Sequence, residues 1–306
     1  MKVLLATQKP FAAAAVAGIE DILNKAGHSL VRLEKYEGEA ELCAAVADVH
    51  ALIIRSDKVT PAVLDAAPAL KIVVRAGAGY DNVDLAAATA RGVVVMNTPG
   101  QNSNAVAELA LAMMIFMARN QFTPATGSEI AGKTLGVQAF GNVGRLVGAK
   151  AAALGMKVRA VDPFLTAEQI VSGGAEPVSS VEELYATSDY VSVHIPATPQ
   201  TVGSIGYDLI TSMPKGATLV NTARKEVVDE AGLDKALGDR PDLKYVTDVA
   251  PDNIAELREK YGLRVFATPK KMGAQSAEAN INAGLAAARQ ICDFFATGST
   301  KFQVNK

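Results

Sequence analysis

The stretch that decides the fold is KTLGVQAFGNVGRLVGAKAAALGMKVRAVD, residues Lys133–Asp162. It opens with a short apolar run, Leu135–Ala139, passes through a turn that contains glycines, and continues as an amphipathic segment. A second apolar run, Lys157–Val161, ends in Asp162. Short apolar runs on either side of a helical pattern predict two parallel strands joined by a crossover helix, the βαβ unit.

The turn of this unit, Ala139-Phe140-Gly141-Asn142-Val143-Gly144, suits the pyrophosphate of a dinucleotide. Gly141 lets the backbone approach the pyrophosphate, Gly144 lets the helix pack closely on the strand, and the helix N-terminus offers unpaired N–H groups. The residues expected to contact the dinucleotide are Gly141, Asn142, Val143 and Gly144. Because the first motif position is Ala139 rather than glycine, an ordinary crossover whose glycines serve only packing remains the alternative.

Asp162, at the end of the second strand, bears on which dinucleotide binds. A carboxylate there accepts hydrogen bonds from the adenosine ribose hydroxyls and repels a 2′-phosphate. The expected cofactor is therefore NAD rather than NADP.

Composition narrows the class of protein. The chain has 306 residues, 49% of them hydrophobic, and a net charge of −2, which predicts a sizeable core and no general attraction to nucleic acid or an anionic membrane. Only Cys43 and Cys292 occur, and the three histidines are scattered, so neither a disulfide framework nor a metal site is expected. The first apolar run is broken by Gln8-Lys9-Pro10 and does not have the form of a signal peptide. We therefore expect a cytoplasmic protein that acts on a small molecule.

Strand and helix patterns alternate along almost the whole chain, which predicts an α/β fold with two doubly wound parallel-sheet (Rossmann-like) domains. A turn-rich segment, residues 97–104, separates them, and we place the first boundary between residues 98 and 99. The second domain, 99–274, is expected to have strands at Thr134–Ala139, Val158–Val161, Tyr190–Val193, Thr218–Asn221, Tyr245–Thr247 and Arg264–Phe266. A last helix, Ala277–Ala296, is compatible with a return to the first domain, which would then comprise 1–98 plus 275–306.

Ligands of an open parallel sheet bind beyond the carboxyl ends of its strands, where the second domain has several polar motifs. The Arg224 guanidinium, just after a predicted strand, can hold a carboxylate through two parallel hydrogen bonds, although it could equally solvate a loop. Asp248 can accept a hydrogen bond from a nicotinamide amide or cap a turn. Other residues at strand ends expected to touch the cofactor are Thr222, Ala223, His194, Ile195 and Pro196. His194 is expected to make a backbone contact rather than to act as the base.

The first domain has two loops suited to anions. In the loop Arg75, Ala76, Gly77 and Ala78, small residues expose successive backbone N–H groups that can bind a carboxylate, with a plain tight turn as the alternative. At another strand end, Arg55, Ser56 and Lys58 supply two cations and a hydroxyl. These suit a phosphate, with a solvated loop as the alternative.

Eight segments in this order, IIRSDKVT, VVRAGAGYDNVD, NTPGQNSNAVAELALAMM, GKTLGVQAFGNVGR, SVHIPATPQT, MPKGATLVNTAR, VVDE and TPKKMGAQS, span nearly the whole chain. Together they resemble the D-2-hydroxyacid dehydrogenase family, with particular likeness to its phosphoglycerate dehydrogenases. The resemblance implies a central NAD domain, a substrate domain built from both chain ends, and an active-site cleft between them. It also implies a homodimer and the short form that lacks a C-terminal regulatory domain. The long apolar helix from Asn104 offers a surface for the second copy, unless its own sheet buries it.

The family uses an arginine, a glutamate and a histidine at its active site, and only the arginine maps cleanly, onto Arg224. The histidine position falls on Lys271 when counted from Gly273 and on Lys270 when counted from Thr268. We favour Lys271 because the glycine turn should fix the site, and we expect Gly273 to lie at the cofactor. The glutamate position falls on Asn253.

The two departures from the family, a lysine at the histidine position and Asn253 at the glutamate position, can be related. A lysine has an unperturbed pKa of about 10.4, and a paired carboxylate would raise that pKa further. Loss of the glutamate, with Arg224 nearby, would keep the pKa of the lysine lower. Our hypothesis is that Lys271 takes the hydroxyl proton while C2 delivers a hydride to NAD.

The resemblance and the cations at Arg55, Lys58 and Arg75 favour oxidation of D-3-phosphoglycerate to 3-phosphohydroxypyruvate, a step of serine biosynthesis. Reduction of hydroxypyruvate or glyoxylate, or another D-2-hydroxyacid, is the alternative substrate class. A non-catalytic protein that senses NAD(H) is the alternative from a different class, because the family's glutamate and histidine are absent.

Overall fold

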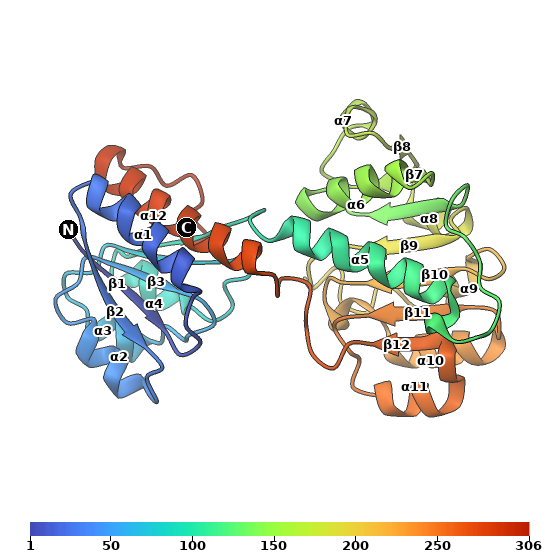
Figure 1. The fold of residues 1–306 in the computed structure, drawn as a ribbon, viewed down its shortest axis with the longest axis horizontal. Coiled ribbons are helices and arrows are strands. Elements are labelled where there is room, and N and C mark those ends of the chain that lie inside the picture. Colours follow the sequence, from blue (N-terminus) through green and yellow to red (C-terminus); the bar gives the residue numbers. More distant parts are fainter. Residues whose placement is uncertain (306) are drawn as a thin grey trace. The chain divides into compact units, whose positions relative to one another are not determined.

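The computed structural model describes residues 1–305 and divides into two compact units (Figure 1). Unit 1 comprises Met1–Asn102 together with the chain from Gln275 onward, and unit 2 comprises Ser103–Ala274. The sequence-based boundary after residue 98 thus lies just before the observed division after Asn102, and the boundary before Gln275 coincides with it.

Unit 1 contains a five-stranded sheet in the order β2-β1-β3-β4-β5, in which all pairs are parallel. Its strands are β1 (Lys2–Thr7), β2 (Ser29–Glu34), β3 (Ala51–Ile54), β4 (Ile72–Arg75) and β5 (Val94–Asn97). Its helices are α1 (Ala13–Lys25), α2 (Glu39–Ala45), α3 (Pro61–Asp65), α4 (Leu85–Ala90) and α12 (Ala277–Thr297). The order changes direction between β1 and β3, so the carboxyl ends of these two strands frame the position where ligands of such sheets bind.

Alternation along the strands explains the two layers of helices in unit 1. In β1, Val3 and Leu5 pack with the α1 and α12 cluster, whereas Leu4 and Ala6 pack with the cluster of α2, α3 and α4. Helices α1 and α12, from opposite ends of the chain, lie side by side on one face of the sheet (Figure 1). The first and last segments of the chain therefore share one core.

Unit 2 contains a seven-stranded sheet in the order β12-β11-β10-β9-β6-β7-β8, also parallel. Its strands are β6 (Thr134–Gln138), β7 (Lys157–Val161), β8 (Glu176–Pro177), β9 (Tyr190–Val193), β10 (Thr218–Asn221), β11 (Lys244–Thr247) and β12 (Val265–Ala267). Its helices are α5 (Ser103–Ala118), α6 (Asn142–Ala153), α7 (Ala167–Ser172), α8 (Val181–Ala186), α9 (Tyr207–Ser212), α10 (Glu230–Asp239) and α11 (Ile254–Tyr261), with short 3₁₀ turns η1 (Asn120–Phe122), η2 (Lys225–Val227) and η3 (Gly262–Arg264). The direction change lies between β6 and β9.

Two hydrophobic clusters cover the two faces of this second sheet. Helices α5 and α6 contribute to one cluster, and α8, α9, α10 and α11 contribute to the other. The predicted fold class, two doubly wound parallel α/β sheets, is confirmed. The sequence missed β8, because a two-residue strand that includes Pro177 has no readable hydrophobic pattern. The predicted first strand of unit 2 also extends one residue too far, since Ala139 leaves the strand with a φ of +73°.

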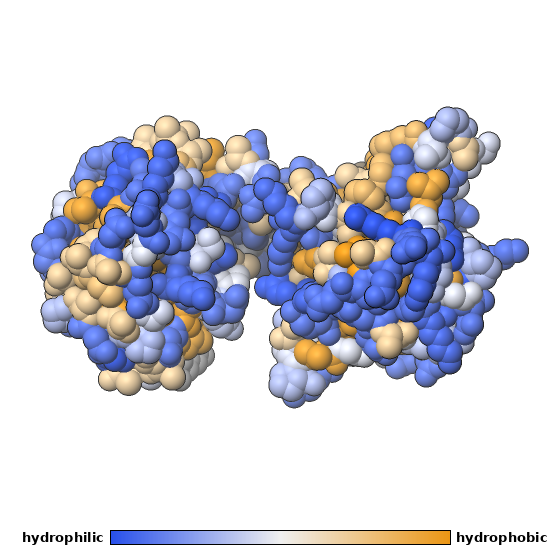
Figure 2. All heavy atoms as spheres, turned by 90° about the horizontal axis from the view of Figure 1, so that it is seen from below, coloured by the Kyte–Doolittle hydropathy of each residue, from blue (hydrophilic) through white to orange (hydrophobic). Residues whose placement is uncertain are grey.

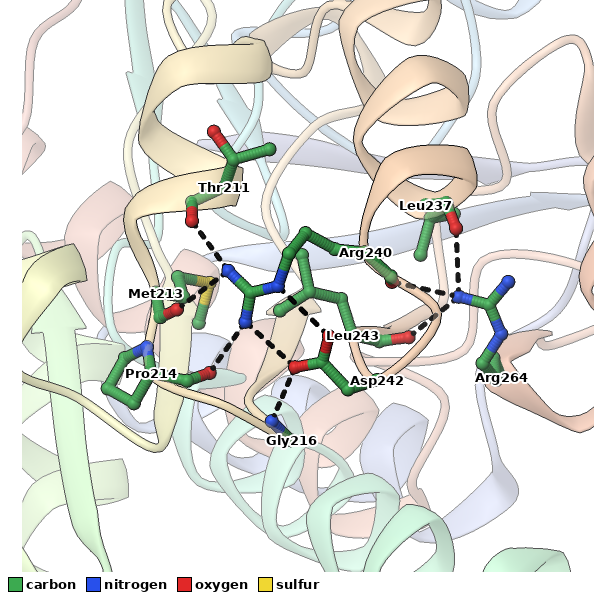
Figure 3. A network of polar contacts seen from close by, with 9 residues as sticks. All are labelled: Thr211, Met213, Pro214, Gly216, Leu237, Arg240, Asp242, Leu243 and Arg264. Atoms are coloured by element: carbon green, nitrogen blue, oxygen red, sulfur yellow. Dashed lines mark hydrogen bonds and ion pairs between the residues drawn. The ribbon is translucent and has the colours of Figure 1, made fainter.

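A polar network joins the segments that lead into β10, β11 and β12, at the amino end of the sheet of unit 2 (Figure 3). The Arg240 guanidinium donates to the carbonyls of Thr211 (2.7 Å) and Met213 (3.2 Å) and pairs with Asp242 (2.7 Å). The Arg264 guanidinium donates to the Leu237 carbonyl (3.0 Å) at the end of α10. These bonds satisfy carbonyls that the ends of α9 and α10 leave without helical partners.

The exposed surface is mixed in character. On the face shown in Figure 2, hydrophilic residues predominate in both units and apolar residues are scattered among them. Within residues 1–305, none of the helices combines the length and the apolar character that crossing a bilayer demands.

Candidate active site

The glycine turn after β6 has one open face and one closed face. Gly141 caps the N-terminus of α6, and a Cβ built on it would meet no atom within 4 Å. A Cβ on Gly144 would lie 2.2 Å from the Ala139 carbonyl oxygen and 3.0 Å from Val137 Cγ1. Gly144 therefore lets α6 pack on β6, and Gly141 leaves space at the helix N-terminus, where an anion could approach.

Asp162 lies beside this turn and organises it. Its Oδ2 accepts a hydrogen bond from the Phe140 N–H and its Oδ1 accepts one from the Phe164 N–H, both at 2.9 Å. Each carboxylate oxygen can accept a second hydrogen bond, so both retain capacity for ribose hydroxyls. The sequence did not foresee that Asp162 also fixes the glycine turn.

Next to Asp162 is a cavity of about 660 Å³ with largely apolar walls. The apolar lining residues include Val161, Leu165, Ile170, Val178, Ile195 and Leu209. A carboxylate at the edge of an apolar cavity suits an adenosine, whose base is apolar on its faces and whose ribose carries hydroxyls. Ile195, one of the residues after β9 that the sequence predicts at the cofactor, lines this cavity.

His194 is partly buried directly after β9. Its Nε2 lies 2.9 Å from the Ser192 hydroxyl oxygen, and its backbone N–H donates to the Gln138 carbonyl at 2.9 Å. Burial lowers the pKa of His194 to about 4, because the charged imidazolium is poorly solvated there. The imidazole is therefore neutral near pH 7 and engaged with Ser192, and the expected backbone contact of this segment with the cofactor stays a prediction.

A second cavity, of about 360 Å³, lies at the carboxyl ends of β10, β11 and β12. Its lining residues include Arg224 after β10, Asp248 after β11, and both Lys270 and Lys271 after β12. Three neighbouring strands thus bring together the arginine, the carboxylate and the two lysines that the sequence proposed separately.

Asn221, which sequence reasoning missed, fixes the loop of Arg224. Its side chain is fully buried, with Nδ2 donating to the Arg224 carbonyl at 2.9 Å and Oδ1 accepting from the Ala223 N–H at 3.0 Å. Thr222, which lies between Asn221 and Ala223 in the sequence, is also buried. The available signal was an asparagine at a strand end, since asparagine side chains commonly bond the backbone of a following turn.

Asp248 performs the turn-capping role and keeps capacity for a ligand. It is 1% exposed, and its Oδ2 accepts hydrogen bonds from the N–H groups of Met272 (3.0 Å) and Gly273 (2.6 Å). Its Oδ1 is buried and accepts no hydrogen bond within residues 1–305. Such an oxygen is costly to leave unpaired, and the N–H of a nicotinamide carboxamide would satisfy it. The Gly273 N–H, in contrast, is engaged by the protein itself.

The two lysines are both exposed and both line the second cavity, so the structure keeps both as candidates. The Lys270 carbonyl accepts a hydrogen bond from the Thr268 hydroxyl at 2.7 Å. Lys271 directly precedes the two N–H groups that Asp248 holds. The glycine turn thus does fix the backbone next to Lys271.

Asn253 is at the N-terminus of α11 and is absent from the lining of the lysine cavity. Its N–H donates to Glu230 at 3.4 Å, and its Oδ1 is buried with no hydrogen-bond partner in the part of the chain described. The adjacent Asp252 forms an ion pair with Lys225 at 2.5 Å. The glutamate that lines the lysine cavity is instead Glu226, which the sequence did not single out.

In unit 1, the Arg75 loop is built around a glycine. A Cβ on Gly77 would lie 1.5 Å from Arg75 Nη1, and the φ of Gly77 is +148°, so the guanidinium lies over this glycine. The Gly77 carbonyl accepts from the Thr98 N–H at 2.9 Å, and the Ala78 carbonyl accepts from the Asn97 side chain at 2.6 Å. The Ala76 N–H, in contrast, is used by the sheet, because it donates to the Ile54 carbonyl at 2.8 Å. Of the small residues in this loop, Gly77 and Ala78 are therefore the ones whose N–H groups stay candidates for an anion.

The Arg55 loop differs from the expectation. Arg55 is half-buried, and its Nη1 donates to the carbonyls of Lys9 (3.2 Å) and Pro10 (3.5 Å). Its Nη2 bonds Asn280 Oδ1, and its guanidinium stacks over the Phe11 ring at 5.1 Å. Several of its donors are thus used inside unit 1, whereas the neighbouring Ser56 and Lys58 are exposed.

Comparison with known proteins gives a consistent result. A family model for the "D-isomer specific 2-hydroxyacid dehydrogenase, catalytic domain" matches residues 10–305. The crystal structure of an NAD⁺-bound 3-phosphoglycerate dehydrogenase from Entamoeba histolytica is 48% identical with a TM-score of 0.88, and the match covers 100% of this chain and 99% of that one.

Curated D-3-phosphoglycerate dehydrogenases from Mycobacterium leprae and Rattus norvegicus are 37% identical over 265 residues and 40% identical over 231 residues. These matches cover 82% and 71% of this chain but 50% and 43% of the relatives. The chain therefore spans about half the length of the curated relatives it matches.

Proposed function

Because the chain belongs to the D-isomer specific 2-hydroxyacid dehydrogenase family, we propose that it oxidises D-3-phosphoglycerate to 3-phosphohydroxypyruvate with NAD, a step of serine biosynthesis. The observation that carries the proposal is the cavity where Arg224, Asp248 and the two lysines meet at three strand ends. The similarity to the NAD⁺-bound 3-phosphoglycerate dehydrogenase of Entamoeba histolytica supports the substrate and the cofactor.

The residues present fit NAD at both of its ends. The open face of Gly141 suits the pyrophosphate, Asp162 and its apolar cavity suit the adenosine, and Asp248 Oδ1 suits the nicotinamide carboxamide. When bound, NAD supplies the acceptor for the hydride from C2 of the substrate. The protein supplies orientation for this transfer.

Arg224 and Lys271 act on the substrate. The Arg224 guanidinium binds the substrate carboxylate and polarises the oxygen on C2. Lys271, as the neutral amine, accepts the proton of the C2 hydroxyl, and in the reverse direction its ammonium returns that proton. The C2–H electron pair leaves as hydride while the hydroxyl proton moves to the lysine, so the step is balanced. For the Arg75 loop of unit 1, binding of a substrate anion stays a prediction.

A different 2-hydroxy acid is the second candidate, and one observation favours it. The donors of Arg55 that were expected to meet a phosphate are used by the Lys9 and Pro10 carbonyls and by Asn280. A smaller substrate such as glyoxylate or hydroxypyruvate has no phosphate to bind.

We also propose that the active form is a homodimer joined through α5. The outer surface of this helix lines an apolar cavity of about 410 Å³ with Phe122 and Phe266. Phe122 is 69% exposed and Ile115 is 36% exposed. An apolar surface of this kind is typical of protein interfaces. Sedimentation of the wild type and of Phe122→Asp tests this, and a monomeric wild type would refute it.

The function is tested by measuring NADH formation from D-3-phosphoglycerate against pH, for the wild type, Lys271→Ala and Lys270→Ala. A lysine base predicts wild-type activity that rises toward alkaline pH, loss of activity in Lys271→Ala, and little change in Lys270→Ala. The opposite pattern would assign the base to Lys270. NADH binding without turnover of any 2-hydroxy acid would instead identify a non-catalytic NAD(H) sensor.

A further inference from the structure

One carboxylate on the wall of the lysine cavity is not used by the proposed reaction. Glu226 lies in the short turn η2 after β10, and its exposed side chain lines the same cavity of about 360 Å³ as Lys270 and Lys271. A sphere of this volume is about 9 Å across. At that separation, in a partly wet site, one charge shifts the pKa of another by about 0.5–1 unit, so Glu226 is near enough to influence a lysine base.

The backbone of η2 is anchored on the side away from the cavity. The Glu226 carbonyl accepts a hydrogen bond from the Gly203 N–H at 2.8 Å, and the Val227 carbonyl accepts one from the Ile205 N–H at 3.0 Å. The Val227 side chain is fully buried in the core of unit 2. The fold therefore fixes the backbone from which the Glu226 side chain reaches the cavity.

The other charged groups around the cavity have partners of their own or serve the ligands. Lys225 is ion-paired with Asp252 at 2.5 Å. Asp248 is buried, and its Oδ2 accepts hydrogen bonds from two backbone N–H groups. In the proposed reaction, Arg224 binds the substrate carboxylate. Among the residues that line the cavity, Glu226 is thus the exposed carboxylate that remains to balance the charge of the lysines.

Glu226 also supplies a charge that Asn253 does not have. The family resemblance implies a glutamate at the position of Asn253, whose amide is neutral and does not line the cavity. Glu226 follows β10 rather than β11, so the carboxylate is present at the cavity but comes from the neighbouring strand end. A carboxylate near an amine favours the ammonium form of that amine.

We propose that Glu226 takes the place of the family's glutamate as a positioning residue that acts through Lys271, by stabilising the ammonium that forms when Lys271 accepts the hydroxyl proton. The inference rests on the proposed function, because it concerns the base of that reaction. The proton moves from the C2 hydroxyl to Lys271 Nζ while the C2–H electron pair leaves as hydride to NAD. Glu226 neither gains nor loses a proton in this step.

The charge of Glu226 has opposite effects on the rate of oxidation at low and at high pH. Near pH 7 it lowers the fraction of Lys271 that is present as the neutral amine, which slows the reaction. At alkaline pH, where the amine is neutral in any case, the higher basicity of Lys271 speeds proton transfer. Removal of the charge should therefore change the shape of the pH profile and not only its height.

The pH dependence of kcat/KM for D-3-phosphoglycerate, at saturating NAD, tests the inference in the wild type and Glu226→Gln. We expect the acid limb of the Glu226→Gln profile to lie about 0.5–1 pH unit lower. With a Brønsted coefficient of about one half, kcat/KM of the variant should be about two- to threefold higher near pH 7 and about two- to threefold lower on the alkaline plateau. The two profiles then cross. A loss of folded enzyme cannot produce a crossing, because it lowers activity by the same factor at every pH.

Glu226→Asp and Glu256→Gln are the matched controls. Glu226→Asp keeps the charge, so its acid limb should stay within about 0.3 pH unit of the wild type. Glu256 is also an exposed glutamate of unit 2, on α11, but it does not line the cavity. Glu256→Gln should therefore follow the wild-type profile. The inference is overturned if the profile of Glu226→Gln superimposes on that of the wild type, or if Glu256→Gln shifts it as far.

Competitive labelling with acetic anhydride separates this inference from the proposed function, since it requires no turnover. Mass spectrometry follows the acetylation of Lys271 Nζ against pH in the wild type and in Glu226→Gln. A lower pKa of Lys271 in Glu226→Gln supports the coupling of the two groups. An equal pKa in both proteins, or a shift confined to Lys270, refutes it. If the wild type does not oxidise D-3-phosphoglycerate, the proposed function fails separately, and the labelling result still decides on Glu226.

Discussion

Alanine substitutions at Gly141 and Gly144 should separate the two roles of the glycine turn. A Cβ on Gly144 would lie 2.2 Å from the Ala139 carbonyl oxygen, whereas real contacts of a Cβ essentially never fall below 3.0 Å. Helix α6 or the turn must therefore move by at least 0.8 Å, the difference between 3.0 and 2.2 Å. The turn resists this movement, because the Ala139 N–H donates a hydrogen bond to the Val161 carbonyl at 2.9 Å.

Overpacking of this kind costs about 1–3 kcal/mol of unfolding free energy. We expect Gly144→Ala to lose that amount in urea denaturation. A displacement approaching 1 Å at the pyrophosphate turn should also weaken NADH binding by about 10- to 100-fold. Gly141→Ala is the matched control, since its Cβ would meet no protein atom within 4 Å.

Gly141→Ala should keep the stability of the wild type but still bind NADH at least tenfold more weakly, because its methyl group occupies the face that the pyrophosphate approaches. Fluorescence titration with NADH and urea denaturation of the same preparations give both quantities. The reasoning is refuted if Gly144→Ala is as stable as the wild type, or if Gly141→Ala binds NADH with unchanged affinity.

Two further predictions concern stability. Ala139→Gly removes the strain of a positive φ, which is worth about 1 kcal/mol, but it also raises the conformational entropy of the unfolded chain, which costs a similar free energy. The unfolding free energy of Ala139→Gly should therefore change less than that of Ala152→Gly. The latter substitution lies in an exposed part of a helix and should lower the unfolding free energy by about 1 kcal/mol. A larger loss in Ala139→Gly would contradict this. The Arg240 guanidinium lowers the pKa of Asp242 in the folded protein. The ionised carboxylate therefore stabilises the fold at pH values above the pKa that Asp242 has in the unfolded chain, and this stabilisation is lost as the pH falls below that pKa. Asp242→Asn should therefore have an unfolding free energy roughly 1.5 kcal/mol below that of the wild type near pH 7. This difference between variant and wild type should shrink below about pH 4. If urea denaturation gives the same difference at every pH, the stabilisation is not ionic in origin.

The sequence predicted the fold well because strong hydrophobic patterns coincide with the elements. Strands such as Ala51–Ile54 and Ile72–Arg75 are continuous apolar runs, as expected of parallel strands buried on both faces. It failed where a local conformation overrides the pattern, as at Ala139, or where an element is too short to have one, as at β8.

The candidate site was predictable in part. Residues that follow strands, such as Arg224 and Asp248, could be selected because the fold places strand ends together. The behaviour of Arg55 could not be predicted, because Asn280, one of its partners, is 225 positions away along the chain. A cation in a loop has the same sequence signal whether it meets a ligand or a backbone carbonyl.

Asp248 shows how one side chain can relate the two parts of the proposed reaction. Its Oδ2 holds the N–H groups that directly follow Lys271, and its unpaired Oδ1 is the oxygen that we assign to the nicotinamide carboxamide. The proton acceptor and the hydride acceptor would then be positioned by the same buried carboxylate. Hydride transfer is sensitive to displacements of about 1 Å, so a shared anchor is better suited to it than two independent ones. In the proposed reaction, a lysine would take the place of the histidine that the family resemblance implies, and the turn held by Asp248 would determine where its backbone lies.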